Sequence, residues 1–94
     1  MREWINLLQE SKKLHLDFDP SAGFLDAYLE DGWIHLSAIG SHRKGGGTTM
    51  MRKLCSFADE HDLPIELLAL EAEPFYAKFG FSPIGDDRMR REPQ

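Results

Sequence analysis

The sequence has little cysteine and no long apolar run. Its single cysteine, Cys55, excludes an internal disulfide and leaves no thiolate cluster for a metal ion. No apolar run approaches the roughly 20 residues of a membrane-spanning helix, and the N-terminus lacks the apolar segment of a signal peptide. We therefore expect a cytoplasmic protein with no metal site and no membrane contact.

Positive charge is also scarce. The chain has 11 Lys and Arg residues against 16 Asp and Glu residues, and its net charge is −5. A phosphate backbone repels a domain of this charge, so we expect no nucleic-acid partner. An acidic surface suits a cationic partner, such as an amine or a lysine-bearing protein.

Hydrophobic residues make up 41% of the 94 residues, which is enough for one small domain spanning residues 1–94. Apolar spacings predict a helix, an antiparallel meander of three strands, and then a helix, a strand, a helix and a strand. The step from the third strand through a helix to the fourth strand is a crossover, which is normally parallel. The sequence therefore predicts an α/β or α+β domain with a mixed sheet. The expected helices cover residues 2–13, 48–61 and 74–79, and the expected strands cover 13–19, 24–30, 33–39, 65–70 and 88–91.

A basic, glycine-rich turn joins the third strand to the second helix. Residues 42–49 read HRKGGGTT. Unpaired backbone N–H groups and the helix dipole make such a helix start an anion site, and glycines let an anion approach the backbone. The turn therefore predicts a phosphate or pyrophosphate site. We expect a bulky or charged side chain at Gly46 or Gly47 to abolish binding and to leave the fold intact.

Two segments resemble the GCN5-related N-acetyltransferase (GNAT) family. Residues 42–47 resemble its loop signature of Arg or Gln, two residues, Gly, one residue, and Gly or Ala. Residues 72–81, AEPFYAKFGF, resemble its A-x-x-F-Y-x-K-x-G-F segment. The resemblance implies a GNAT-like, mostly antiparallel mixed sheet flanked by helices. It also implies acetyl transfer from acetyl-CoA (coenzyme A) to a primary amine, on a small molecule or a protein lysine.

The resemblance implies roles for particular residues. Tyr76 corresponds to the tyrosine that protonates the departing thiolate, which a phenol with a pKa of about 10 can do once positioned; packing as a core aromatic is the alternative. The strand end before the loop corresponds to the edge that holds the pantetheine arm and polarises the thioester carbonyl. The residues assigned to the coenzyme are Ser37, Ala38, Ile39, His42, Arg43, Lys44, Gly45, Gly46, Gly47, Thr48 and Thr49.

The general base is assigned to His35. The family often places a glutamate on this strand at the position of Trp33, and His35 lies two residues further along, on the same face. Its imidazole could accept the amine proton through water, whereas an ordinary surface histidine is the alternative. Glu71 and Glu73 could also border the acceptor site, although carboxylates are common at a helix start in any case.

The sequence departs from the family's pattern at three places, and the missing strand glutamate together with the short acceptor region leaves a second interpretation open. His42 replaces the usual Arg or Gln, Ala69 stands where a polar residue is common, and the region that usually holds the acceptor is short. The second interpretation is a non-catalytic coenzyme-A-binding or protein-interaction module with the same fold. A phosphate-loop nucleotide enzyme is disfavoured because the loop has no Gly-Lys-Ser/Thr ending. The edges of a short open sheet favour a homodimer.

Overall fold

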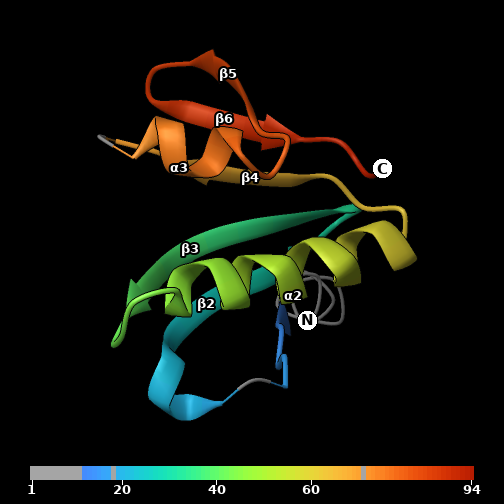
Figure 1. Cartoon of the computed structure of the whole chain (residues 1–94). Helices are drawn as coiled ribbons and strands as arrows, with labels where there is room; N and C mark the ends of the chain where they lie inside the picture. The colour runs from blue at the N-terminus through green and yellow to red at the C-terminus, as the bar shows by residue number, and fades with distance from the viewer. Residues whose placement is uncertain (1–11, 18, 71) are drawn as a thin grey trace, which may run out of the picture.

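The protein is built on one mixed sheet of six strands (Figure 1). The computed structural model describes residues 12–17, 19–70 and 72–94. The strand order is β1-β2-β3-β4-β6-β5, and all neighbouring pairs are antiparallel except β3 and β4. The expected α+β architecture and the parallel crossover are confirmed. The elements are β1 (Lys12–Lys13), the 3-10 helix η1 (Pro20–Ala22), β2 (Gly23–Glu30), β3 (Trp33–Ser41), α2 (Gly46–Glu60), β4 (Ile65–Leu68), α3 (Glu73–Ala77), β5 (Ser82–Gly85) and β6 (Arg88–Arg91).

Strand β3 carries a bulge in the middle of its ladder with β2. Ala27 of β2 pairs with Leu36, but the preceding residue, Asp26, pairs with Ala38. Ser37 is therefore the extra residue and has no partner on β2. A bulge bends the strand and re-aims the side chains that follow it.

The bulge decides which β3 side chains face the helices. Before it, Ile34 and Leu36 are buried in the core. Regular alternation would next turn Ala38 inward. Because Ser37 is inserted, Ile39 and Ser41 instead line a pocket on the helix side of the sheet. Strand β3 thus supplies core residues in its first half and pocket residues in its second half.

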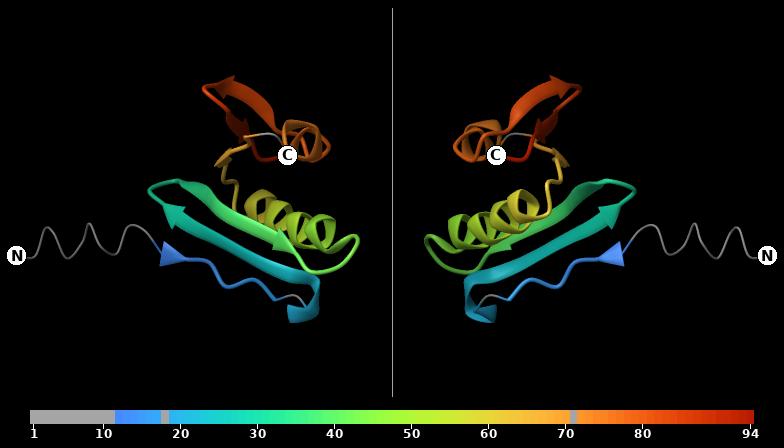
Figure 2. Two further views of the ribbon diagram at one scale, coloured as in Figure 1. Left: turned by 90° about the vertical axis from the view of Figure 1, so that its left-hand side faces the viewer. Right: turned by 90° about the vertical axis from the view of Figure 1, so that its right-hand side faces the viewer.

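Helices α2 and α3 lie on the same side of the sheet (Figure 2). The apolar residues of α2 recur at intervals of three and four, which places them on the one face that the sheet buries. Each large side chain buried in this layer contributes about 1.5–3 kcal/mol. The largest fully buried side chains are Ile34, Met50, Met51, Leu54, Ile65 and Met89. No helix in the described ranges is long and apolar enough to cross a membrane.

Strands β3 and β4 separate soon after they meet. They pair over only three positions, from Ile34 with Ile65 to Leu36 with Leu67. Beyond this point β3 continues along β2, β4 continues along β6, and Figure 1 shows the two strands diverging. Within the described ranges, the edge of β3 that faces β4 has no strand partner after Leu36. This opening is the main irregularity of the sheet.

The N-terminal expectations are only partly met. The helix expected over 2–13 lies outside the described residues except for Lys12 and Lys13, for which it is wrong: they pair with β2 as strand β1. The strand expected over 13–19 is also wrong beyond its start. The Leu14 N–H still donates to β2, but residues 15–17 leave the sheet, and Phe18 lies outside the described residues.

The C-terminal half follows the expected order and contains one additional strand. The sequence does not predict β5, because Pro83 and Gly85 are both unfavourable in strands. Strand β5 forms as an edge strand against β6, with a register shift after Pro83. The hairpin predicted at Asp31 and Gly32 is confirmed, with Gly32 in the left-handed region at φ +84°.

Candidate functional site

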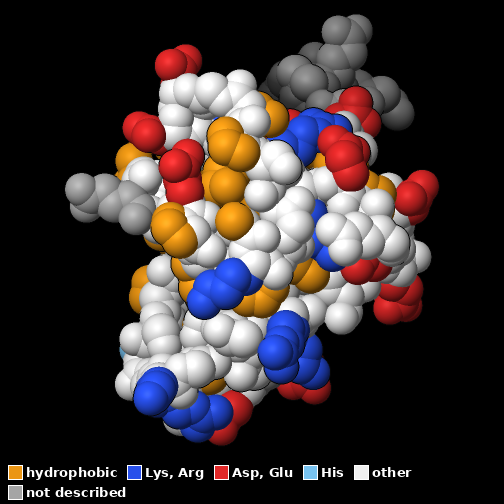
Figure 3. Space-filling view, turned by 45° about the horizontal axis from the view of Figure 1, so that its top comes forward, with side chains coloured by type: hydrophobic (Ala, Val, Ile, Leu, Met, Phe, Trp, Pro, Cys, Tyr) orange, Lys and Arg blue, Asp and Glu red, His pale blue; other side chains and the backbone are white. Residues whose placement is uncertain are grey.

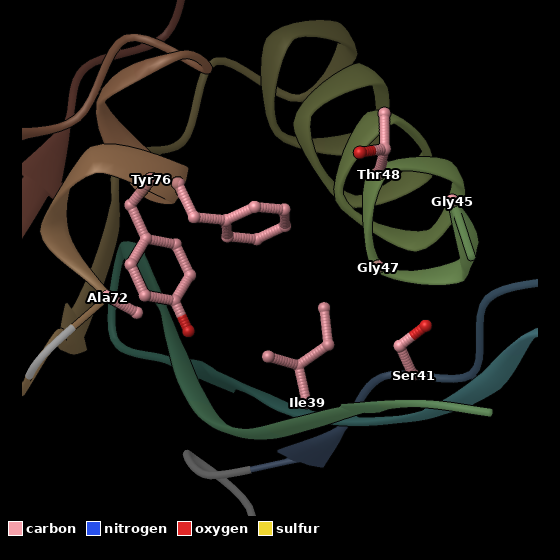
Figure 4. Close-up of a pocket in the computed structure, with 8 residues that line it drawn as sticks. Ile39, Ser41, Gly45, Gly47, Thr48, Ala72 and Tyr76 are labelled. Atoms are coloured by element: carbon pink, nitrogen blue, oxygen red, sulfur yellow. The ribbon is translucent and has the colours of Figure 1, made fainter. Parts of the chain in front are cut away.

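A pocket of about 340 Å³ opens where β3 and β4 separate. Figure 4 shows Tyr76 reaching from α3 toward β3, while Ser41, Gly45 and Thr48 lie at the other end, beside the start of α2. The walls therefore come from the second half of β3, the first turn of α2 and the first turn of α3. The lining residues are Ile39, Ser41, Gly45, Gly47, Thr48, Ala72, Phe75 and Tyr76.

The glycine loop ends in a helix start with open backbone donors. Gly45 is the N-cap and lies in the left-handed region at φ +82°, where glycine is favoured. The Gly46 N–H donates to the Arg43 carbonyl oxygen at 3.0 Å, and the Thr49 N–H donates to the Gly45 carbonyl oxygen at 3.0 Å. In the described part of the chain, no hydrogen bond engages the N–H groups of Gly47 and Thr48. Together with the helix dipole, these groups form a site for an anion.

The glycines of the loop differ in what a side chain at each position would contact. A Cβ at Gly46 would overlap the carbonyl oxygen of Ala22 in η1, so this glycine permits close packing of the loop on η1. A Cβ at Gly47 would lie 3.3 Å from the ring of Phe75, which can move slightly. The expectation that a larger residue at Gly46 leaves the fold intact is therefore wrong, because backbone cannot move aside as a side chain can.

The basic side chains of the loop are not all free to meet an anion. Arg43 turns toward η1, where its guanidinium donates to Ser21 Oγ at 2.7 Å and lies 3.5 Å from an Asp19 carboxylate oxygen. Lys44 is exposed and forms no ion pair within the described ranges. The ring of His42 lies 6.1 Å from that of Phe24. Lys44 is thus the loop side chain best placed for a mobile anionic ligand.

Tyr76 is held by aromatic contacts and presents its hydroxyl to the pocket. The residue is 8% exposed. Its ring meets Phe75 and Phe81 edge to face at centroid distances of 5.3 and 5.9 Å. Its hydroxyl forms no hydrogen bond within the described residues. A tyrosine is protonated at neutral pH in any case, and burial raises the pKa of Tyr76 further above its ordinary value.

His35 lies outside this pocket. Neighbouring side chains of a strand point to opposite faces, and Leu36 is in the core, so His35 lies on the face away from α2. It borders a separate recess of about 230 Å³, next to Glu66, whose carboxylate pairs with Arg88 at 3.0 Å. Glu73 is exposed in the first turn of α3, and Glu71 lies outside the described residues. The structure therefore does not bring His35 and Tyr76 into one pocket.

The pocket contains part of the set assigned from the sequence. Ile39, Gly45, Gly47, Thr48 and Tyr76 line it, whereas Ser37, Ala38, His42, Arg43, Lys44, Gly46 and Thr49 do not. Ser41, Ala72 and Phe75 are additional lining residues. Ala72 and Phe75 belong to the segment that resembles the family, which is a signal that the sequence carried. Ser41 reaches the pocket only because the bulge shifts the alternation of β3, and no sequence signal marks the bulge.

The fold and the pocket define a small α+β domain with a pocket between the second half of β3 and the first turns of α2 and α3. No protein-family model and no curated protein matches the chain. Among solved structures, it is similar to the crystal structure of anti-CRISPR protein AcrVA5, with a TM-score of 0.66 and 22% sequence identity. The match covers 85% of this chain and 96% of that chain. At this identity the likeness establishes a shared fold.

Proposed function

We propose that the protein is an acetyl-CoA-dependent N-acetyltransferase that acts on a primary amine. One observation carries the proposal: the opening between β3 and β4 leads into a pocket with free helix N–H groups at one end and the Tyr76 hydroxyl at the other. The resemblance of residues 42–47 and 72–81 to the GNAT family supports the same assignment.

The residues present fit the two ends of the acyl donor. The N–H groups of Gly47 and Thr48 suit the pyrophosphate, because donors at a helix start bind anions, and Lys44 adds positive charge. The absence of side chains at Gly45 and Gly47 leaves the backbone accessible. The unpaired edge of β3 after Ser37 offers N–H and C=O groups to the amides of the pantetheine arm. The pocket has a polar end and an apolar middle lined by Ile39 and Phe75, which suits the alternating polar and apolar groups of that arm.

The chemistry needs few groups from the chain. The thioester supplies an electrophilic acyl carbon and a thiolate leaving group. A backbone N–H of residues 37–39 stabilises charge that develops on the carbonyl oxygen. The amine nitrogen bonds to the acyl carbon, the C–S bond breaks, and Tyr76 gives its proton to the sulfur. The amine proton leaves through water, and Tyr76 is reprotonated from solvent. His35 lies on the face of the sheet away from this pocket and is given no part in this step.

The acceptor is proposed to be an amine on a protein. One solved structure with this fold is that of an anti-CRISPR protein, and a role of that kind in this chain would favour a protein lysine over a small amine. The homodimer expected from the sheet edges stays a prediction. The edges that would pair are β1 and β5.

A second candidate is a coenzyme-A-binding module without catalysis. None of the eight lining residues is a carboxylate or a histidine, so the pocket itself holds no base for the amine. The two candidates share donor binding and differ in turnover. Release of free thiol from acetyl-CoA in the presence of a lysine-rich peptide distinguishes them.

Calorimetric titration with acetyl-CoA tests donor binding, with Gly47→Asp as the key variant. A carboxylate at this first-turn position favours the helix but repels a phosphate, so we expect binding to weaken at least about tenfold, the equivalent of 1.4 kcal/mol. Gly47→Asn is the matched control, because it has nearly the same shape without the charge. If the wild type and Gly47→Asp bind acetyl-CoA with equal affinity, the phosphates lie elsewhere. No binding by the wild type would refute the proposal.

A further inference from the structure

A second cleft lies further along the same helix, between α2 and the C-terminal end of α3. Thr48, which lines the pocket, is followed on the same face of α2 by Arg52, Cys55 and Asp59, at spacings of four, seven and eleven residues. The last three line a cleft of about 570 Å³, whose other wall contains Lys78 and Phe79. The first turn of α3 and its C-terminal end thus face successive turns of α2.

Phe75 connects the two spaces. Its ring borders the pocket beside Gly47. The same ring packs edge to face with the ring of Phe79, with the centroids 5.3 Å apart. Lys78 Nζ lies over the Phe75 ring, 5.7 Å from its centroid. A ligand whose phosphate sits on the first turn of α2 can therefore extend past this ring without leaving the surface.

The cleft has an excess of positive charge. Its one side-chain carboxylate, Asp59, is neutralised by Arg91, which binds both carboxylate oxygens at 2.8 and 3.0 Å. Arg52 and Lys78 are exposed and form no ion pair within the described ranges. Figure 3 shows basic side chains along the surface formed by α2 and the glycine loop, although the whole chain carries a net charge of −5.

We infer that Arg52 and Lys78 bind a second phosphate group of the donor, the phosphomonoester on the ribose of coenzyme A. A phosphomonoester carries a charge of about −1.5 to −2 at neutral pH, which suits two cations better than one. Arg52 lies about 7 Å further along the helix axis than Gly47, a span similar to that between the 5′ and 3′ phosphates of one ribose. The inference rests on the proposed function and adds donor selectivity to it.

The test compares acetyl-CoA with acetyl-3′-dephospho-CoA by calorimetry at low ionic strength. We expect the wild type to bind acetyl-CoA about tenfold more tightly, since charge-assisted contacts to phosphate are strong. Arg52→Gln and Lys78→Gln should each weaken acetyl-CoA binding several-fold and leave the dephospho ligand unaffected. The preference should shrink as salt rises, because the contacts are exposed and screened.

Lys53→Gln is the matched control. Lys53 neighbours Arg52 on the same helix and is exposed, but it does not line the cleft. Equal affinity for the two ligands would overturn the inference and leave the proposed function standing. A preference for acetyl-CoA that survives in both cleft variants, or that falls equally in Lys53→Gln, would also overturn the assignment of these residues. If neither ligand binds, both the proposed function and this inference are refuted.

Discussion

At the scale of single residues, Tyr76 combines a packed ring with a hydroxyl that faces the pocket. Its ring packs against Phe75 and Phe81, while its hydroxyl faces the pocket without a partner among the described residues. A core tyrosine normally satisfies its hydroxyl with a hydrogen bond. The accessible, unpaired hydroxyl is the group that the proposed proton donation would use, and burial of the side chain accounts for its raised pKa.

Tyr76→Phe tests this explanation because it removes one oxygen and keeps the ring. We expect the rate of thiol release from acetyl-CoA to fall by about 10²-fold, as is typical for the loss of a general acid. The affinity for acetyl-CoA and the thermal midpoint should change little, since no hydrogen bond is lost. Steady-state kinetics and calorimetry on one preparation measure both quantities.

Tyr28→Phe is the control, since Tyr28 is the other tyrosine of the chain and does not line the pocket. The pH dependence gives a further check. Because the pKa of Tyr76 is raised, its proton should remain available until the pH exceeds the ordinary value of 10.0. An unchanged rate in Tyr76→Phe would assign Tyr76 to the core alone.

At the scale of elements, the glycine loop is shaped by η1 as much as by its own sequence. The His42 N–H donates to the Ala22 carbonyl at 2.9 Å, Arg43 donates to Ser21, and Gly46 packs against Ala22. Three contacts therefore fix the loop on a turn that lies about twenty residues earlier in the chain. This arrangement orients the first turn of α2 toward the pocket before any ligand binds.

Alanine at two adjacent glycines separates packing from ligand access. We expect Gly46→Ala to destabilise the fold by about 1–3 kcal/mol, because the new methyl group overlaps the Ala22 carbonyl oxygen. Gly47→Ala should be neutral or stabilising by up to about 1 kcal/mol, since alanine favours helices over glycine and Phe75 can shift. Urea denaturation measures both values. Equal effects at the two positions would show that η1 does not contact the loop as described.

The same elements show what the sequence can and cannot predict. Alternation and helical spacing were sufficient for the meander, the crossover and the helix after the loop, because these patterns are local. The bulge at Ser37 and the roles of Gly46 and Arg43 depend on contacts with β2 and η1, which no local pattern encodes. The position of His35 on the face away from the pocket likewise depends on the burial of its neighbours Ile34 and Leu36.

At the scale of the whole molecule, the sheet has two parts that pair with each other over only a short stretch. The first part is the β1-β2-β3 ladder with α2, and the second is the β4-β6-β5 ladder with α3. Strands β3 and β4 join them over only three residue pairs. On the helix side, Arg91 of β6 reaches α2 and binds Asp59, and it also donates to the Phe79 carbonyl after α3 at 2.6 Å. This buried arginine therefore joins α2 to the segment that follows α3.

Asp59→Asn tests the bridge. Arg91 is 4% exposed, and breaking a fully buried ion pair costs about 3–5 kcal/mol. Because the Asp59 side chain is 30% exposed, we expect a smaller loss of unfolding free energy at neutral pH, about 2 kcal/mol. Glu92→Gln is the control: its exposed pair with Arg90 should contribute at most about 1 kcal/mol.

The dependence of this loss on pH has a definite sign. Hydrogen bonds from Arg91 and from the Gln94 N–H lower the pKa of Asp59 below its ordinary value of 3.8. A group whose pKa is lower in the folded state stabilises the fold above the unfolded value, and this contribution is lost as pH falls through the folded pKa. Wild type and Asp59→Asn should therefore differ at neutral pH and converge in acid. A difference that persists at the lowest pH would mean that the amide disturbs packing, and that the charge of Asp59 does not hold the two parts together.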